Sequence, residues 1–421
     1  MASTTVQREI ESVKPTRQRV MGFIFLGLAA VIWLFLSQST EAGTITTFKL
    51  VPGGTDSNLP DWQIPTLLTL NLLAIVSAFL GGIQLVRGFG NRTNLVLAIV
   101  ASLFIFGFLV WATAGQSMNL GGLLNTTLSA AVPITLGALS GVLCERAGVV
   151  NIAIEGMMLS GAMIASLVGS ISGNLWVGLF AAVLAGAILG MVHAILSIKY
   201  MIDQIISGTV INIFSFGITS FISAKFMQVN LSLNNPGIFS PIEIPVLSKI
   251  PIFGPILFNK NIFIYAMFIF LIVLQIALFY TRWGLRLRSV GENPKAADTL
   301  GIHVFRTRYM AVILGGMMAG FAGAYFTLGS VGRFDEGMTA GRGFISLAAM
   351  IFGNWTPFGS FGASLLFGFS DSLASKLAIL GVQIPSQLLG MAPYIATMIV
   401  LAGVVGRGQM PAADGQPYVK E

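Results

Sequence analysis

Charged residues are scarce in this 421-residue chain, and their scarcity limits what the protein can be. Asp, Glu, Lys and Arg together make up 9% of the sequence, while hydrophobic residues make up 55%. Soluble domains contain about 25% charged residues, so a soluble fold of this composition could not hydrate its surface. The composition therefore excludes a soluble enzyme and a disordered chain, and it indicates a membrane protein.

Reactive residues are equally scarce. The single cysteine, Cys144, excludes a disulfide scaffold. The two histidines, His193 and His303, lie far apart in the sequence, and no Cys/His cluster has the spacing of a metal site. The P-loop sequence G-x-x-x-x-G-K-[ST] is absent as well. We therefore expect no catalytic residue, no metal and no cofactor in this chain, and any energy from ATP must come from elsewhere.

Long apolar stretches dominate the chain instead. A bilayer core of about 30 Å requires about 20 apolar residues per helix, and twelve stretches come close to that length. They predict an all-α, polytopic transmembrane bundle of about 10–12 spans, some of them broken or re-entrant. The stretch 342–354 is short and ends at a proline, which is typical of a half-helix. The twelve stretches are 20–37, 64–86, 95–114, 123–143, 150–171, 175–197, 204–226, 261–280, 308–330, 342–354, 357–376 and 386–406.

The positions of the basic residues predict the orientation of the chain. If all twelve stretches cross and the N-terminus is cytoplasmic, 7 of the 23 Lys and Arg residues lie outside, and the other 16 (23 − 7) lie inside. This excess supports two cytoplasmic termini, so the net charge of +7 is mostly a topology signal and not a sign of nucleic-acid binding. The seven outside residues are Lys49, Lys225, Lys249, Lys260, Arg333, Arg342 and Lys376.

The chain divides by texture into four predicted parts. Residues 1–19 are a cytoplasmic tail, and 20–120 form an accessory segment of three helices rich in Leu, Val, Ile and Phe. Its first helix is too long for the core of a signal peptide, so we expect it to be retained. Residues 121–406 form the core, and 407–421 are a second cytoplasmic tail.

Small residues recur at four-residue spacing in the core. In lipid, helices associate through such faces because close backbone approach replaces the hydrophobic drive. We expect these faces to bury helix against helix. One row is Ala182, Gly186, Gly190 and Ala194; the others are Ala311, Gly315, Ala319 and Gly323, and Gly316, Gly320 and Ala324.

Two loops of the core differ from ordinary connections. The outer stretch 227–260 carries five prolines, and this composition fits a stiff, extended ledge or a merely compact loop equally well. The inner stretch 281–308 encodes a short helix outside the membrane: Asn293 can cap it, Pro294 suits its first position, Ala296 and Ala297 favour helix, and Gly301 can end it. So short a helix needs a partner or neighbouring helices for stability.

Acidic residues inside the spans are few. Only Glu155 and Asp371 lie within predicted spans; the composition favours a structural polar clamp over substrate contact for each, and it does not form the acidic chain of a proton pump. Uncharged polar residues beside aromatic ones suit a neutral polar solute. We assign the substrate pathway to the segments 150–156 and 204–216. The pathway candidates are Asn125, Asn151, Glu155, Gln204, Ser207, Asn212 and Phe216.

Two motifs in this order resemble a known family. The stretches GVLCERAGVVNIAIEGMMLSGA (141–162) and RSVGENPKAADTLGI (288–302) resemble the permease subunits of bacterial ABC importers for nucleosides, simple sugars, ribose and branched-chain amino acids. The resemblance covers about 120–406 and is greatest to the nucleoside-type subgroup. Members of that subgroup usually begin near residue 120, so the resemblance does not extend to the first three helices.

The resemblance implies a function and a set of partners. It implies that the chain translocates a small polar solute, a nucleoside or a simple sugar, across the plasma membrane of a bacterium. It further implies a cytoplasmic ATPase that binds ATP and Mg, a second permease, usually a related but different chain, and an extracytoplasmic binding protein, commonly a lipoprotein, that contacts the ledge 227–260. The ATPase would dock on a coupling helix formed by Asn293, Pro294, Lys295, Ala296, Ala297, Asp298 and Gly301.

Two expectations can be separated from this one. An ion-gradient-driven secondary transporter is the alternative, and it would depend on Glu155 or Asp371. If the coupling helix inserts its Ala-Ala face into the ATPase, Ala297→Arg should abolish coupling and leave the protein folded.

Overall fold

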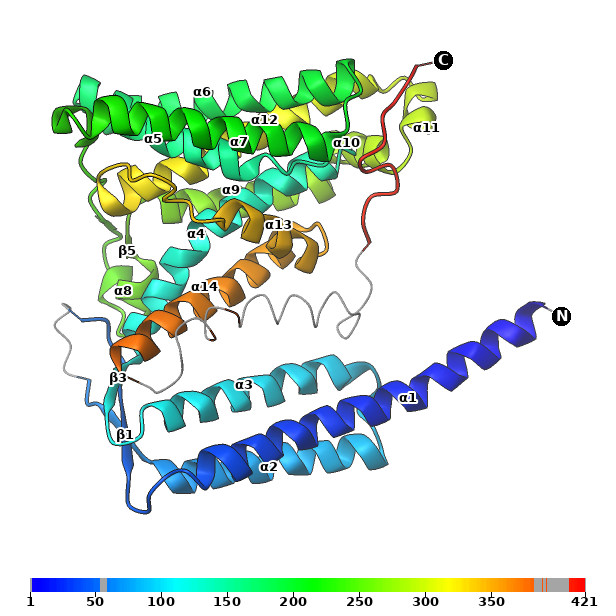
Figure 1. Ribbon diagram of the computed structural model, residues 1–421. Coiled ribbons are helices and arrows are strands. Elements are labelled where there is room, and N and C mark those ends of the chain that lie inside the picture. Colours follow the sequence, from blue (N-terminus) through cyan, green and yellow to red (C-terminus); the bar gives the residue numbers. More distant parts are fainter. Residues whose placement is uncertain (1, 54–58, 382–387, 389–390, 392–408, 421) are drawn as a thin grey trace. The chain divides into compact units, whose positions relative to one another are not determined.

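The structure is a computed structural model, and it describes residues 2–53, 59–381, 388, 391 and 409–420, with side chains from residue 17 onward. The chain divides into two units, one of Met1–Gly122 with Lys376–Gln383 and one of Leu123–Ser375 with Ile384–Glu421. Each unit is described by itself below (Figure 1).

The first unit is built from three long apolar helices. The first helix, α1, packs along α2 at points where glycines leave no side chain between them: a Cβ on Gly81 would lie 2.9 Å from Leu26. The outer faces carry large apolar side chains in the open, such as Phe23 and Phe79, as expected of helices surrounded by lipid. These helices are α1 (Ala2–Val31), continued by the π-helical turn η1 (Ile32–Ser37), then α2 (Thr66–Val86), the 3-10 turn η2 (Gly90–Arg92) and α3 (Thr93–Ala112).

A small sheet lies at the end of these helices away from the N-terminus (Figure 1). Strand β1 (Ile45–Lys49) pairs antiparallel with β2 (Trp62–Pro65) and parallel with β3 (Ser117–Asn119). The rings of Phe48 and Trp62 pack against Phe106, with centroids 5.8–6.1 Å apart. The sequence did not predict this sheet, because strands of three to five residues give no usable periodicity.

The second unit contains the remaining helices. Four of its spans end or continue as π-helical turns or are interrupted, and α4 contains Pro133. The long helices are α4 (Leu120–Glu145), α5 (Ile154–Ser172), α6 (Leu175–Ala194) with η3 (Ile195–Lys199), α7 (Gln204–Ile222) with η4 (Ser223–Met227), α9 (Ile262–Tyr280), α12 (Val304–Ala324) with η7 (Tyr325–Val331) and α14 (Pro357–Ile379). The shorter ones are α8 (Phe253–Leu257), α10 (Arg282–Glu292), α11 (Pro294–Thr299) and α13 (Arg342–Phe352).

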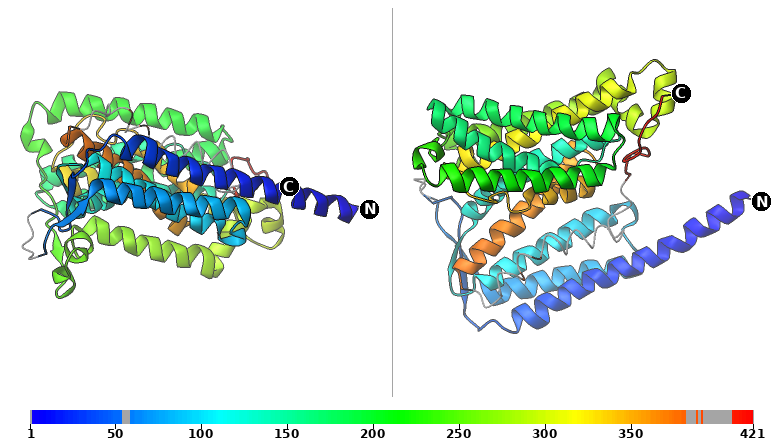
Figure 2. Two further views of the ribbon diagram at one scale, coloured as in Figure 1. Left: turned by 90° about the horizontal axis from the view of Figure 1, so that it is seen from below. Right: turned by 45° about the horizontal axis from the view of Figure 1, so that its top comes forward.

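Helices α5, α6 and α12 form the centre of this unit, although α12 is distant in sequence from the other two (Figure 2). A Cβ on Gly186 would lie 2.8 Å from the backbone of Gly320, and one on Gly190 would lie 2.9 Å from the carbonyl oxygen of Val312. Neither position could hold a larger residue without moving a helix backbone. The predicted use of the small-residue faces as helix contacts is therefore confirmed.

The predicted spans are largely confirmed. Among the described residues, nine helices are long and apolar enough to cross a membrane, and they correspond to the first nine predicted stretches. The tenth stretch forms the 11-residue α13, which agrees with a half-helix. The eleventh forms the 23-residue α14, whose Asp371 and Lys376 make it less apolar. The twelfth, 386–406, lies almost wholly outside the described residues. The chain is thus a multi-pass helical membrane protein.

The proline-rich stretch after α7 is a compact loop with short elements of its own. It contains the 3-10 turns η5 (Leu231–Asn234) and η6 (Leu247–Lys249), the helix α8, and strands β4 (Ile242–Glu243) and β5 (Asn259–Lys260), which pair antiparallel. The two strands close the loop on itself, so the compact alternative describes this loop better than an extended ledge.

Candidate functional site

The connection between α4 and α5, residues 146–153, is held by polar side chains from two neighbouring helices. The amide of Val150 donates to Gln204 Oε1 at 2.6 Å, and His193 Nε2 lies 2.9 Å from the carbonyl oxygen of Val150. A carbonyl oxygen only accepts, so Nε2 carries the proton and Nδ1 accepts from the Ser207 hydroxyl at 3.0 Å. Both sides of one peptide link are thereby fixed by α6 and α7.

Two asparagines fix the following residues. Asn212, on α7, donates from Nδ2 to the carbonyl oxygen of Ile152 at 2.9 Å and accepts from the amide of Gly156 at 2.8 Å. Asn151 is fully buried, accepts from the amide of Ala153 at 3.1 Å and directs its Nδ2 to Cys144 Sγ at 3.5 Å. The segment 150–156 is therefore bonded on all sides by amide and imidazole groups.

Glu155 joins α5 to the start of α13. Its Oε1 accepts from the Thr339 hydroxyl at 2.6 Å and the Gly341 amide at 2.9 Å, and its Oε2 accepts from the Gly343 amide at 2.6 Å. The carboxylate thus satisfies free amides at a helix N-terminus, where negative charge is favoured. This contact is the polar clamp that the sequence favoured for Glu155.

Five of the seven pathway candidates come together around this segment: Asn151, Glu155, Gln204, Ser207 and Asn212. In this conformation their polar groups bond to the protein itself. Asn125 lies elsewhere and accepts a hydrogen bond from the buried Lys260, whose pKa burial lowers to about 8. Phe216 is 52% exposed on α7. A role of these seven residues in substrate passage stays a prediction.

The inner loop 281–308 folds as the sequence predicted. Asn293 caps α11 by accepting from the Ala296 amide at 3.1 Å, Pro294 occupies the first helical position, and Gly301 ends the segment with φ +79°. Before it, α10 carries Arg288, which lies over the Phe279 ring at 4.9 Å. A capped helix of six residues is thus presented at one end of the unit (Figure 1).

The expectation for Ala297 is wrong in one respect. Ala297 is only 2% exposed and packs against Val290, Val304 and Tyr418, whereas Ala296 is exposed. The two alanines therefore face opposite sides of α11, and only Ala296 is available to another protein. An arginine at 297 would have to displace this small core, so the variant would not leave the local fold intact.

The C-terminal tail, residues 409–420, packs on the same end of the unit. Its Ala413 amide donates to the Gly291 carbonyl at 2.9 Å, and its Gln416 carbonyl accepts from Arg308 Nη1 at 2.9 Å. Lys420 lies 3.5 Å from Asp298 on α11, and the ring centroids of Tyr418 and Phe305 are 5.4 Å apart. The tail is thereby tied to α10, α11 and the start of α12.

Buried ionisable groups under the tail were missed by the sequence analysis. Glu145 is 5% exposed and accepts from Trp355 Nε1 at 2.5 Å, and Arg146 donates to the Trp355 carbonyl at 2.8 Å. Asp414, 8% exposed, lies beside Glu145 and Arg308, and burial raises the pKa of its carboxyl to about 7. The adjacent Glu145-Arg146 pair and the helix-breaking residues around Trp355 were the available signals, but the tail that covers them could not be placed from sequence.

The second acid of the spans is also paired. Asp371, on α14, accepts from Arg342 at 3.1 Å, and both side chains are partly open to solvent. Among the described residues, no group of three or more His, Cys, Asp or Glu side chains could hold a metal ion. The described site thus consists of polar clamps around a mobile-sized connection and a capped helix beside it, an arrangement suited to a membrane transport protein.

Comparison with known proteins identifies the class. Residues 123–405 match the family described as "Branched-chain amino acid transport system / permease component", so the chain belongs to that family. No solved structure matches the chain. The resemblance found from the two motifs is therefore confirmed, and the protein is a permease component and not an enzyme.

Three relatives show where in the family the chain lies. It is 40% identical to the guanosine ABC transporter permease protein NupQ of Bacillus subtilis, over 70% of this chain and 95% of NupQ. It is 40% identical to the nucleoside ABC transporter permease protein NupC of Lactococcus lactis, over 68% of this chain and 93% of NupC. It is 33% identical to the putative glucose permease TsgC13 of Haloferax volcanii, over 71% of this chain and 98% of TsgC13.

Proposed function

We propose that this chain is a transmembrane subunit of an ATP-driven importer and that it carries a nucleoside across the plasma membrane of a bacterium. The observation that carries the substrate class is the similarity to permeases named for guanosine and nucleosides, at 40% identity over nearly their whole length. The relative named for glucose is less similar, at 33%. A nucleoside is therefore a better candidate than a simple sugar.

In this proposal α11 is the coupling helix. Its buried side, Ala297, rests on the core and the tail, while Ala296 and the end residue Leu300, 81% exposed, face outward. A six-residue helix that is anchored on one side and open on the other can be moved by a partner as a rigid element. Asn293 and Pro294 set its start, Gly301 sets its end, and Lys295 and Asp298 flank the open side.

The partners follow from the same assignment. A cytoplasmic ATPase would bind ATP and Mg and dock on α11, which places both termini in the cytoplasm. The second permease would be a related but different chain, as suggested by two nucleoside permease relatives, NupB and NupC, from one Lactococcus lactis strain. An extracytoplasmic binding protein, a lipoprotein, would contact the loop 227–260 and supply the solute.

Substrate passage would involve the clamped segment 150–156 and α7. We propose that its polar groups exchange bonds within the protein for bonds to the solute when the unit alternates between outward-open and inward-open states. Asn151, Glu155, Gln204, Ser207 and Asn212 would serve this role, with Asn125 and Phe216 farther along the path. Neutral amides and hydroxyls can hydrogen-bond a nucleoside base and ribose and still release them.

The ion-driven alternative is less well supported. It needs an acid that is free to bind and release an ion, but Glu155 accepts three hydrogen bonds and Asp371 pairs with Arg342. The permease relatives are named as ABC transporter proteins.

The test combines co-purification with uptake. The tagged chain is isolated from membranes in mild detergent, its partners are identified by mass spectrometry, and the complex is assayed in liposomes with labelled guanosine. Ala296→Arg should lower ATP-driven uptake by about tenfold or more, as expected when a charge is buried unpaired in an interface, while Ala296→Ser should retain it. Recovery of the chain alone, with uptake independent of ATP, would contradict the proposal.

A further inference from the structure

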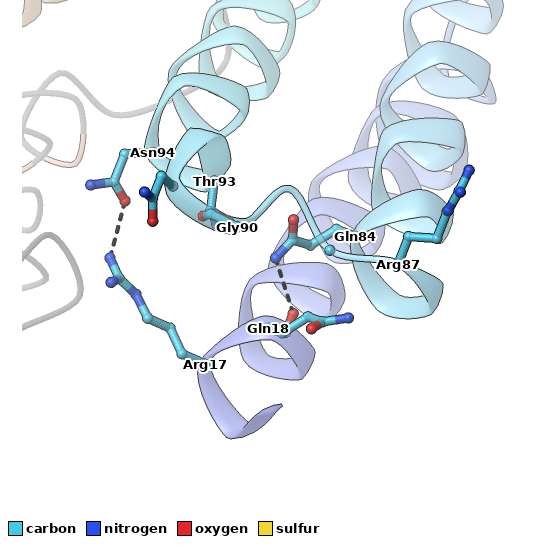
Figure 3. A pocket seen from close by; sticks show the side chains of 9 residues that line it. Arg17, Gln18, Gln84, Arg87, Gly90, Thr93 and Asn94 are labelled. Atoms are coloured by element: carbon cyan, nitrogen blue, oxygen red, sulfur yellow. Dashed lines mark hydrogen bonds between the residues drawn. The ribbon is translucent and has the colours of Figure 1, made fainter. Parts of the chain in front are cut away.

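A polar pocket lies at one end of the first unit, where the turn between α2 and α3 meets α1 (Figure 3). Its volume is about 490 Å³, within the range of sites that hold small ligands. The lining comes from three separate segments of the chain. Its residues are Arg17, Gln18, Gln84, Arg87, Gly88, Gly90, Asn91, Thr93 and Asn94.

The pocket walls are fixed by hydrogen bonds. Gln84 is 1% exposed; its Nε2 donates to the Gln18 carbonyl at 3.4 Å, and its Oε1 accepts from the Phe89 amide at 3.1 Å. The turn requires glycine at Gly88, because its φ is +67° and a Cβ there would lie 2.7 Å from Gln18. The pocket is therefore formed by a defined turn packed on α1, and not by loose surface side chains.

The charge in the pocket is of one sign. Arg17 and Arg87 are the charged lining residues, and none of the nine lining residues is acidic. Within the described part of the chain, no carboxylate pairs with either arginine; Arg17 donates to Asn94 Oδ1 at 3.0 Å. Figure 3 shows Arg17 and Arg87 approaching from opposite sides, with Arg87 extended away from the centre. Both are exposed, so rotation about their side-chain bonds could bring them onto an anion.

Apolar surface adjoins the pocket on the side of the helices. Phe23 on α1 is 65% exposed, Val86 on α2 is 83% exposed and Leu95 on α3 is 60% exposed. Each lies within six or seven residues of a lining residue on its own helix, Val86 and Leu95 directly beside one. A molecule that fits both surfaces carries an anionic group at one end and apolar chains at the other.

We propose that this pocket binds the phosphate group of an anionic phospholipid in the inner leaflet of the membrane. Basic pockets between transmembrane helices on the cytoplasmic side attract such headgroups, and the basic residues at this end place it on that side. The guanidinium groups would contact the phosphate oxygens, and amides such as Asn91 would contact the glycerol part. This binding is separate from solute transport and does not depend on the ATPase.

A free phosphate ester has the same anionic chemistry, and general attraction of basic residues to the membrane is the other explanation. The full-length chain in mild detergent is titrated with phosphatidylglycerol or phosphatidylcholine, and bound lipid is counted by native mass spectrometry. The double variant R17Q/R87Q should weaken phosphatidylglycerol binding about thirtyfold, since each arginine contributes roughly a factor of five. Phosphatidylcholine binding should change little.

Matched variants separate the explanations. Arg19 and Arg92 are exposed, lie in the same unit and do not line the pocket, so R19Q/R92Q removes the same charge and should change binding by no more than about threefold. Asn94→Asp places a carboxylate beside Arg17 in the first turn of α3, where an acid stabilises a helix. It should abolish the preference for phosphatidylglycerol while the protein melts no earlier than the wild type.

Two results would overturn the proposal. Equal losses in R17Q/R87Q and R19Q/R92Q would mean that charge near the membrane, and not the pocket, attracts the lipid. Complete competition by millimolar glycerol 1-phosphate or inorganic phosphate would assign the pocket to a soluble phosphate ester. A preference for phosphatidylglycerol that resists both anions and is lost only in the pocket variants would support the lipid.

Discussion

The helices of the first unit and the central helices of the second differ in what surrounds them. In the most apolar windows of α1, α2 and α3, 28–39% of the residues are buried within the protein, compared with 89% in α4, 67% in α5 and 78% in α12. The less buried helices are rich in large apolar residues, which lipid solvates as well as protein does. The central helices carry glycines and polar groups, which need protein neighbours. In a membrane, hydropathy alone therefore does not predict the interior.

The largest expected effect is at the contact between α6 and α12. Gly186→Leu would place a side chain where the Gly320 backbone lies 2.8 Å from the first added atom. Because backbone cannot rotate away as a side chain can, the cost should exceed the roughly 1–3 kcal/mol of ordinary overpacking. We expect almost no folded protein in size-exclusion chromatography after detergent extraction.

Two controls sharpen this contrast between the units. Gly27, on α1, and Gly217, on α7, have nothing within 4 Å of an added Cβ. Gly27→Leu and Gly217→Leu should both yield wild-type amounts of folded protein. A loss in all three variants would mean that glycine matters through helix flexibility, and the distinction between close contacts and lipid-facing surface would fail.

Much of this contrast could be predicted from the sequence. The four-residue spacing of Gly186 and Gly190 indicates a helix contact on purely local grounds, and the caps at Asn293 and Gly301 depend only on neighbouring residues. The partners of long-range contacts could not be predicted. Ala297 has an exposed and a buried side only once Tyr418 is placed, and nothing in the local sequence connects residues 121 positions apart.

The polar clamps are the next feature that distinguishes the core. Glu155→Ala removes the acceptor of three hydrogen bonds at the start of α13. Hydrogen bonds to charged groups contribute about 1.5–3 kcal/mol each, with incomplete additivity, so we expect a loss of about 3–5 kcal/mol in thermal unfolding. In the first unit, Asn71 accepts one bond from Ser37 at 2.8 Å, and Asn71→Ala should cost only about 1 kcal/mol.

Glu155→Gln distinguishes a clamp from an ion-binding acid. A glutamine keeps one oxygen acceptor but cannot accept all three bonds, so it should destabilise the protein less than alanine and keep part of the uptake. If Glu155→Gln were fully stable yet inactive, with uptake driven by a proton gradient, the clamp interpretation would be contradicted.

The tail provides a smaller effect that is confined to the core. Tyr418 is 6% exposed and packs on Ala297, Val290 and Val304. Tyr418→Ala should weaken tail docking by about 2–4 kcal/mol, as for other buried large-to-small changes. Hydrogen exchange of the amides in 294–301 should accelerate. Val419 is 59% exposed, so Val419→Ala should leave exchange unchanged; equal acceleration in both variants would argue against a docked Tyr418.

The smallest expected effect is a dependence of tail docking on pH. Burial raises the pKa of Asp414 to about 7, above its ordinary value of 3.8. The docked tail therefore binds a proton more tightly than the free tail, so docking is fully favoured below the ordinary pKa and weakens as pH rises to about 7. Between pH 5.5 and 8.0 the docking equilibrium should fall by about tenfold, measured as faster proteolysis within 409–420. Asp414→Asn cannot lose a proton, so its tail should be cleaved at the same rate at both values after correction for protease activity. A wild-type tail that is cleaved more slowly at pH 8.0 would show that the neighbouring Arg308 stabilises the charged carboxylate more than burial destabilises it.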